Sequence, residues 1–210
     1  MTEALLDMLL IKRPVDTVIR VYRGPNVTML YPQVMGHESV NANTRMNMTI
    51  RNRTMELVRS LIQPDLKTTI DGSFEIKNNQ RGILSLVLVG LAEFGGAHPM
   101  TKALSLTMDT ATGQNYALHQ LFHQDGRYSE IINAEIQRQI VQRQIPLLEG
   151  FKGISANQDY YVSDSILVIY YQLYELSPYA AGFPYFPIPL YMLSDVIPED
   201  SLLSRLNYFI

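Results

Sequence analysis

Two side chains of this 210-residue sequence, His98 and Glu175, could form an acid–base pair. An imidazole can act as a general base when a carboxylate orients it, and such a pair could hydrolyse a bound amide or sugar. The chemistry requires the two side chains to lie within about 3 Å of each other, or one water apart, in a pocket. A hydrolase is therefore one alternative for the function.

Other catalytic and metal-binding patterns are missing from the sequence. His119 and His123 have the i, i+4 spacing of a zinc pair, but no carboxylate lies between them and no third ligand follows. There is no cysteine, and the GxxxxGK[ST], GxGxxG and GxSxG motifs do not occur. We therefore predict no metal, no cofactor and no assigned catalytic residue.

Tyrosine and phenylalanine gather in the last third of the chain. A tyrosine ring combines a large apolar area with a polar tip, which suits recognition of a protein or sugar surface. About half of the rings must face the core, because side chains alternate along a strand. The block consists of Tyr160, Tyr161, Tyr170, Tyr171, Tyr174, Tyr179, Phe183, Tyr185, Phe186 and Tyr191. The residues that we predict to bind a ligand are His98, Tyr170, Tyr174, Glu175, Tyr179, Phe183 and Tyr185.

Composition restricts the class of protein. The hydrophobic fraction of 47% with 18% charged residues indicates a folded globular chain. The net charge of -3 disfavours a nucleic-acid partner, which would require a basic face. The apolar run at residues 5–11 is flanked by Glu3 and contains Asp7, so we expect no secretory signal, and no stretch is long enough for a membrane span. The sequence does not indicate the cellular compartment of the protein.

The elements that must position these residues follow from hydrophobic spacing. Helical spacing predicts two long helices, from Asn41 to the residues before Pro64 and from Arg127 to Gln144. Alternating or continuous apolar runs separated by turn residues predict the strands 16–23, 26–34, 68–77, 83–91, 104–108, 160–162 and 166–174. A Pro-rich aromatic loop and a short helical piece near 192–196 follow these strands.

This order of elements predicts an α+β fold, in which an antiparallel sheet built from hairpins has two long helices packed on one face. A seam at residues 63–68 would divide a hairpin-plus-helix segment, residues 1–66, from a larger domain, residues 67–210. We expect the two to pack as one compact unit.

Three segments resemble a known family. EFGGAHP (93–99), TMDTATGQNYALHQLF (107–122) and the stretch from Tyr160 to Leu193, which contains YELSPYAAG, are similar to motifs that recur in this order in the extracytoplasmic domain shared by RsiV-type anti-sigma factors and PdaC-type peptidoglycan deacetylases. The matched positions are Gly95, Gly96, Ala97, His98, Tyr174, Glu175, Pro178, Tyr179, Ala180 and Gly182.

The resemblance implies a non-catalytic α+β binding domain of a Gram-positive bacterium. RsiV-type members of that family bind lysozyme, and the deacetylases carry the domain beside a separate catalytic domain. The sigma-binding segment and the membrane helix that precede the domain in RsiV-type receptors are not seen here, which counts against anti-sigma activity. We expect a lysozyme-type protein or peptidoglycan as the ligand; the alternatives are the hydrolase that uses His98 and Glu175, and a structural or assembly protein of the spore or envelope.

Overall fold

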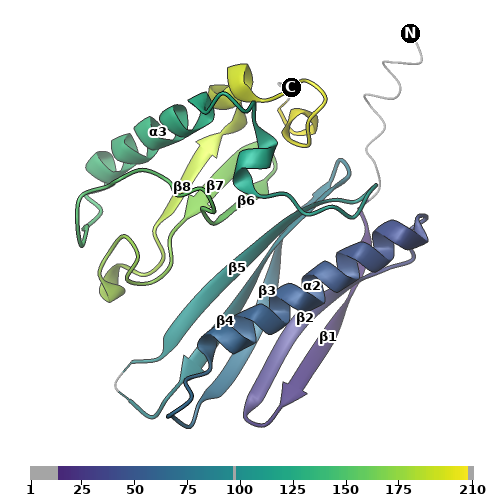
Figure 1. The fold of residues 1–210 in the computed structure, drawn as a ribbon, viewed down its shortest axis with the longest axis vertical. Helices are drawn as coiled ribbons and strands as arrows, with labels where there is room; N and C mark the ends of the chain where they lie inside the picture. Colours follow the sequence, from purple (N-terminus) through teal and green to yellow (C-terminus); the bar gives the residue numbers. More distant parts are fainter. Residues whose placement is uncertain (1–13, 97, 208–210) are drawn as a thin grey trace.

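The computed structural model describes residues 14–96 and 98–207, which form a mixed α+β fold with two sheets (Figure 1). The apolar run at residues 5–11 and Ala97 of the GGAH turn lie outside these residues. Among the described residues, no helix is both long and apolar enough to cross a membrane. The described residues form a large sheet that packs with one long helix and a small sheet that packs with another.

The large sheet has the strand order β1-β2-β3-β4-β5. Its strands are β1 (Asp16–Gly24), β2 (Val27–Met35), β3 (Thr69–Gln80), β4 (Ile83–Glu93) and β5 (Met100–Asp109). Neighbouring strands run antiparallel except β2 and β3, which pair in parallel through residues 27–29 and 70–72. The expectation of a wholly antiparallel sheet is thus corrected, because the long helix between β2 and β3 is a crossover that returns the chain in the same direction.

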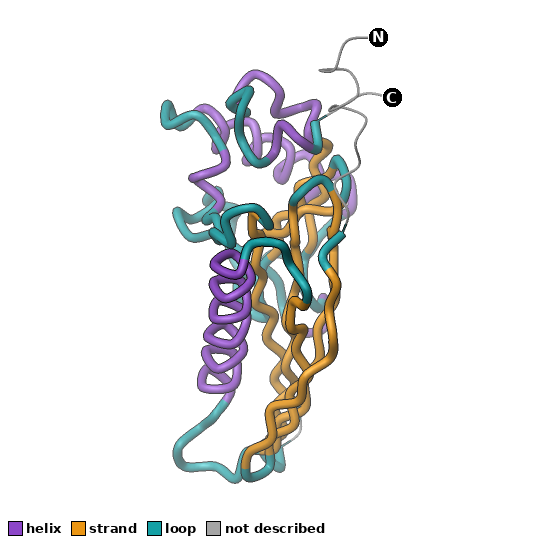
Figure 2. Tube along the Cα trace, turned by 90° about the vertical axis from the view of Figure 1, so that its right-hand side faces the viewer, coloured by secondary structure: helices purple, strands orange, loops and turns teal. Residues whose placement is uncertain are grey.

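That helix, α2 (Val40–Leu61), covers one face of the large sheet, as Figure 2 shows from the side. Ser39 caps its start by accepting a hydrogen bond from the backbone N–H of Ala42 at 3.2 Å. Its apolar side chains are buried against even-numbered residues of β4. This core comprises Met46, Ile50, Leu57, Val58 and Leu61 of α2 with Leu84, Leu86 and Leu88 of β4.

The small sheet has the order β6-β7-β8, with β6 (Tyr160–Ser163), β7 (Ile166–Tyr170) and β8 (Tyr185–Pro189) all antiparallel. The second long helix, α3 (Arg127–Arg143), packs against this sheet, and its Ile132, Ile136 and Ile140 belong to the same core as Phe186 and Ile188. Four short 3-10 helices complete the fold: η1 (Leu118–Leu121), η2 (Tyr179–Ala181), η3 (Leu190–Val196) and η4 (Leu203–Arg205). The two long helices therefore cover different sheets, and their placement on one face is not confirmed.

Strand β8 lies in the segment predicted to be a Pro-rich loop. Pro187 and Pro189 have no N–H, but they occupy positions of an edge strand that face away from β7. Helix α3 covers this edge, because Gln139 Nε2 donates to the carbonyl of Pro187 at 2.7 Å and Arg143 donates to the carbonyl of Tyr185 at 2.6 Å. The prolines are tolerated at an edge whose carbonyl oxygens are paired by a helix.

The two sheets meet where β6 lies against β3, β4 and β5. The backbone N–H of Val162 donates to Ser85 Oγ of β4 at 3.1 Å. The Tyr170 ring packs with Val87 and Ala103, and its hydroxyl donates to Ser105 Oγ at 3.1 Å. Since odd-numbered β4 residues face this junction and even-numbered ones face α2, strand β4 is covered on both faces where it adjoins β6.

Candidate functional site

Three of the predicted ligand-binding residues form a chain of rings, of which Tyr179, in the middle, is partly buried. The ring centroids of Tyr174 and Tyr179 are 5.5 Å apart, and those of Tyr179 and His98 are 5.3 Å apart. The Tyr179 hydroxyl donates to the carbonyl of Pro99 at 3.0 Å, which ties η2 to the β4–β5 loop. Tyr174 is 51% exposed and His98 is exposed. These rings from distant segments thus form one aromatic surface.

A second group of predicted residues lies between the sheets. Phe183 stacks on Tyr185 at 6.2 Å between ring centroids, and Tyr185 lies 5.9 Å from Tyr170. Tyr185 is 39% exposed, whereas Tyr170 is 0% exposed. Tyr170 therefore joins the two sheets and does not present its ring to a ligand.

A pocket of about 360 Å³ adjoins the exposed rings. Tyr171, Tyr174, Glu175 and Leu176 form one wall, and residues 148–153, from the segment after α3, form much of the other. The two walls are joined by a hydrogen bond from the N–H of Leu148 to the carbonyl of Leu176 at 3.0 Å. The pocket therefore brings together two predicted residues and a loop that the sequence analysis had not selected.

Tyr171 lines this pocket, and its hydroxyl oxygen is buried without a hydrogen-bond partner among the described residues. Tyr171 is only 5% exposed, and burial raises the pKa of its hydroxyl, so the group stays a donor at neutral pH. An unpaired buried hydroxyl costs about 1 to 3 kcal/mol. A ligand oxygen that reached this hydroxyl would recover that cost.

Glu175 is positioned by its own turn. Its Oε2 accepts a hydrogen bond from the backbone N–H of Gln172 at 2.7 Å, and burial raises the pKa of its carboxyl. Within residues 14–96 and 98–207, it forms no hydrogen bond or ion pair with His98, which instead contacts Tyr179. A direct hydrogen bond between the two members of the predicted acid–base pair is therefore absent from the described residues.

Tyr174 has a left-handed backbone, with φ of 65°. Residues with a Cβ rarely adopt this conformation, at a cost of about 1 to 2 kcal/mol, and it is retained where the surroundings impose it. Here it places the ring beside Tyr179 at the mouth of the pocket. Strain of this kind is frequent at binding sites.

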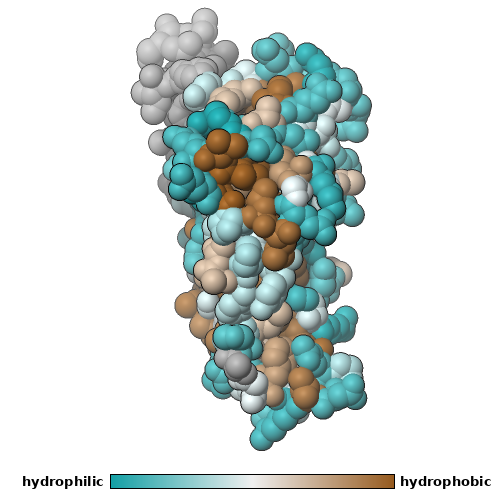
Figure 3. Space-filling view, turned by 90° about the vertical axis from the view of Figure 1, so that its left-hand side faces the viewer, coloured by the Kyte–Doolittle hydropathy of each residue, from teal (hydrophilic) through white to brown (hydrophobic). Residues whose placement is uncertain are grey.

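The face that carries the C-terminal end of α3 and the loop after it exposes hydrophobic surface in its upper half (Figure 3). On this part of the chain, Val141 is 69% exposed and Leu148, which also lines the pocket, is 50% exposed. A mostly apolar lining with a few polar groups is typical of ligand sites. The spacing of Gly150 and Gly153 was the one sequence signal for this loop, and Gly153 adopts a φ of 95°.

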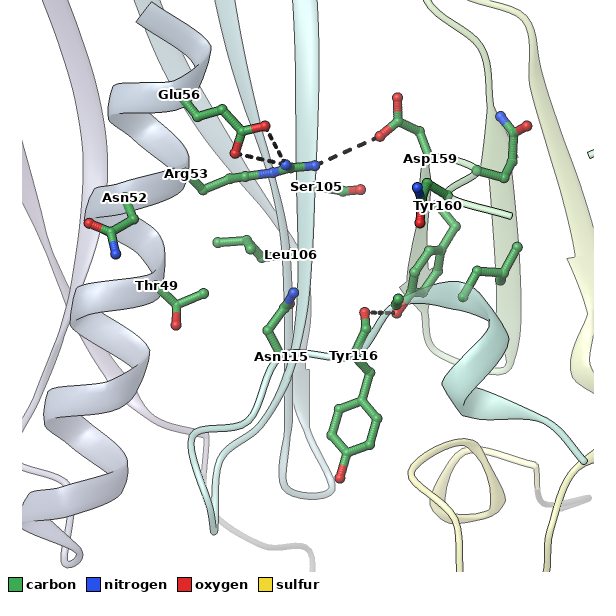
Figure 4. Close-up of a pocket in the computed structure, with 14 residues that line it drawn as sticks. Thr49, Asn52, Arg53, Glu56, Ser105, Leu106, Asn115, Tyr116, Asp159 and Tyr160 are labelled. Atoms are coloured by element: carbon green, nitrogen blue, oxygen red, sulfur yellow. Dashed lines mark hydrogen bonds and ion pairs between the residues drawn. The ribbon is translucent and has the colours of Figure 1, made fainter. Parts of the chain in front are cut away.

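A second, larger cleft of about 590 Å³ lies between α2, β5 and the residues before β6 (Figure 4). Arg53 extends across it from α2: one terminal nitrogen donates to both carboxylate oxygens of Glu56 at 2.8 and 2.9 Å, and the other lies 4.0 Å from Asp159 Oδ1. Tyr160 closes one end by donating its hydroxyl to the carbonyl of Tyr116 at 2.6 Å. The sequence did not indicate this cleft, because the residues that line it come from four separate segments.

Asp159 should make stability depend on pH. Burial raises the pKa of its carboxyl above the ordinary value of 3.8, so the folded protein binds this proton more tightly than the unfolded chain does. The free energy of unfolding that Asp159 contributes must then fall as pH rises from about 4 through the raised pKa. Asp159→Asn removes the charge and keeps an acceptor for Gln172 Nε2, now 2.7 Å from the carboxylate.

We expect Asp159→Asn to gain stability relative to wild type over this range, by about 1.4 kcal/mol for each unit by which the pKa is raised. Urea denaturation of both proteins at about pH 3 and about pH 7 measures the change. A difference between the two proteins that is the same at both pH values would contradict it.

No group of three or more His, Cys, Asp or Glu side chains in the described part of the chain is arranged to hold a metal ion. His119 lies in η1 and His123 just after it, where the backbone N–H of His123 donates to the carbonyl of Val196 at 2.9 Å. The pocket beside Tyr174 and the rings next to it offer groups for aromatic stacking and hydrogen bonding.

Comparison with known proteins gives a family match for part of the chain. Residues 119–191 match the family described as "Protein of unknown function (DUF3298)". This segment contains α3, β6, β7, η2 and β8, with every predicted ligand-binding residue except His98. No curated protein matches the sequence significantly.

Solved structures share the fold of almost the whole chain. A member of the DUF3298 family from Bacteroides fragilis NCTC 9343 has a TM-score of 0.66 at 12% identity, covering 94% of this chain and 98% of that one. A DUF3298 family protein from Pseudomonas aeruginosa PAO1 has a TM-score of 0.68 at 11% identity, covering 89% and 95%. This chain thus carries a segment that matches the DUF3298 family, and its fold is that of two solved proteins of that family.

Proposed function

We propose that the protein is a non-catalytic binding domain for a cell-envelope ligand, and that peptidoglycan sugars occupy the pocket beside Tyr171, Tyr174 and Glu175. The observation that carries this proposal is that Tyr171, which lines the pocket beside the exposed Tyr174 ring, has a buried hydroxyl without a partner among the described residues. Sugar rings offer both an apolar face and many hydroxyl oxygens. The pocket supplies a ring for the face and polar groups for the hydroxyls.

The size and the lining of the pocket support a sugar ligand. Its volume of about 360 Å³ falls within the range of small-molecule sites, which is about 300 to 1,000 Å³. The chain of rings from Tyr174 through Tyr179 to His98 continues outward from the pocket, so a second sugar unit could stack there. The carboxylate of Glu175 is an acceptor for a sugar hydroxyl.

Recognition without catalysis accounts for the arrangement better than hydrolysis does. The hydrolase alternative needs a base oriented by a carboxylate, and Glu175 is engaged by the Gln172 backbone while His98 contacts a ring. The proposal therefore assigns both residues to binding.

Calorimetric titration tests the proposal. Soluble muropeptides and, separately, lysozyme are added to the purified protein. We expect heat of binding with muropeptides; heat with lysozyme alone would replace the sugar with a lysozyme-type protein as the ligand. The absence of heat with either would contradict the proposed function.

Tyr171→Phe should separate stability from binding. Removing an unpaired buried hydroxyl should raise the free energy of unfolding by about 1 kcal/mol, while muropeptide affinity falls about tenfold because a hydrogen bond is lost. Urea denaturation and calorimetry measure the two effects.

Tyr160→Phe is the matched control. Tyr160 is also buried, but its hydroxyl is paired with the carbonyl of Tyr116, so the variant should lose about 1 kcal/mol of stability. If Tyr171→Phe were destabilised as much as Tyr160→Phe, the hydroxyl of Tyr171 would have a partner and the argument from it would fail.

A further inference from the structure

Strand β5 is an edge of the large sheet, and residues from later in the chain pair with several of its outward-facing peptide groups. At Ala103, the side-chain amide of Gln172 accepts from the N–H at 3.1 Å and donates to the carbonyl at 2.6 Å. At Thr107, Asn115 Oδ1 accepts from the N–H at 3.0 Å, and the N–H of Tyr116 donates to the carbonyl at 3.0 Å. Each of these positions is paired much as a neighbouring strand would pair it.

Ser105 lies midway between these two positions. The register of β5 with β4 is regular from Met100 to Asp109, so outward and inward peptide groups alternate and the N–H and C=O of Ser105 face outward. Within the described residues, nothing pairs with these two main-chain groups; only the Ser105 hydroxyl is engaged, by Tyr170. Ser105 lines the cleft of about 590 Å³, so one open strand position faces a hollow.

We propose that this cleft binds an extended peptide segment, which pairs one of its peptide groups with the N–H and C=O of Ser105. The Gln172 side chain already shows that an amide fits this edge two residues away, with both its donor and its acceptor engaged. A peptide in extended conformation offers the same donor and acceptor pair. Gln158 lines both this cleft and the sugar pocket, and the cleft is tested without a sugar.

The charges in the cleft select the peptide. Glu56 and Asp159 contribute two carboxylates against one guanidinium from Arg53, and the Glu56 carboxylate is mostly exposed. Other residues that line the cleft, such as Thr49 and Asn52, carry no charge. A basic side chain next to the paired peptide group complements this excess of negative charge.

Nuclear magnetic resonance tests the site with two probes, the capped tripeptides acetyl-Ala-Lys-Ala-amide and acetyl-Ala-Glu-Ala-amide. We expect the lysine peptide to shift the amide signal of Ser105 and to bind more tightly than the glutamate peptide. An unchanged Ser105 signal with both peptides would overturn the proposal, and tighter binding of the glutamate peptide would overturn its charge preference.

Two variants of Ser105 isolate the main-chain contact. Ser105→Pro removes an N–H that the sheet does not use, because proline is tolerated at outward positions of an edge strand. We expect it to lower the affinity for the lysine peptide about tenfold. Ser105→Ala keeps the N–H and loses the hydroxyl, so its affinity should stay within about twofold. Equal affinities of the two variants would contradict the proposal.

Hydrogen exchange of the unliganded wild-type protein keeps the test valid even if Ser105→Pro fails to fold. The amides of Ala103 and Thr107 are hydrogen-bonded, so they should exchange at least tenfold more slowly than that of Ser105. A Ser105 amide that is protected as well as its neighbours would show that the position is not open.

Discussion

Tyr170→Ala is expected to lower the free energy of unfolding by about 3 to 5 kcal/mol, the range for deleting a buried aromatic ring. Tyr170 is fully buried, packs against Val87 and Ala103, and donates its hydroxyl toward Ser105 and the carbonyl of Ala103. Removing the ring leaves a cavity between the two sheets. Urea denaturation monitored by circular dichroism measures the loss.

Tyr170→Phe is the matched control, because it keeps the ring and removes only the hydroxyl. It should cost about 1 to 2 kcal/mol. If Tyr170→Ala cost no more than Tyr170→Phe, ring packing at the junction would contribute nothing, and the account of how the sheets are joined would be wrong.

Gly113→Ala is the second change with a large expected effect. Gly113 has a φ of 71°, and a Cβ added there would lie 2.6 Å from the carbonyl oxygen of Ala42 in α2. The left-handed backbone and the clash together should cost about 2 to 5 kcal/mol. Thermal and urea unfolding of the variant measure this loss.

Gly126→Ala separates the two causes. Gly126 has a similar φ of 79°, but an added Cβ would have nothing within 4 Å. It should cost only the backbone share, about 1 to 2 kcal/mol. Equal losses in the two variants would mean that the close approach of the 110–113 turn to α2 is unimportant.

Local patterns predicted most elements correctly. The helix from Asn41 to before Pro64 is α2 at Val40–Leu61, and the helix from Arg127 to Gln144 is α3 at Arg127–Arg143. The apolar run 83–91 is β4 at Ile83–Glu93, covered on both faces as such runs indicate. In each of these segments, the prediction depends only on the spacing of apolar residues that lie a few positions apart in the sequence.

What the sequence did not reveal depends on contacts between distant segments. The parallel pairing of β2 with β3 is fixed by tertiary packing of α2, and β8 is stabilised by Gln139 and Arg143 of α3. Residue types alone identified Tyr174, Tyr179 and His98 as candidates. The sequence could not identify the unpaired hydroxyl of Tyr171, because its surroundings come from distant segments. Pairing of a buried group can be determined only once its neighbours are placed.

The most direct test of the central claim compares muropeptide binding by the wild type with two tyrosine variants. Tyr174→Gly deletes the ring at the pocket, and glycine accepts the left-handed backbone without strain. Tyr191→Ala deletes another exposed ring, which lies in η3 and lines none of the pockets described above. We predict that calorimetry will give wild-type affinity for Tyr191→Ala and a loss of about tenfold or more for Tyr174→Gly. Wild-type affinity in Tyr174→Gly would contradict the account.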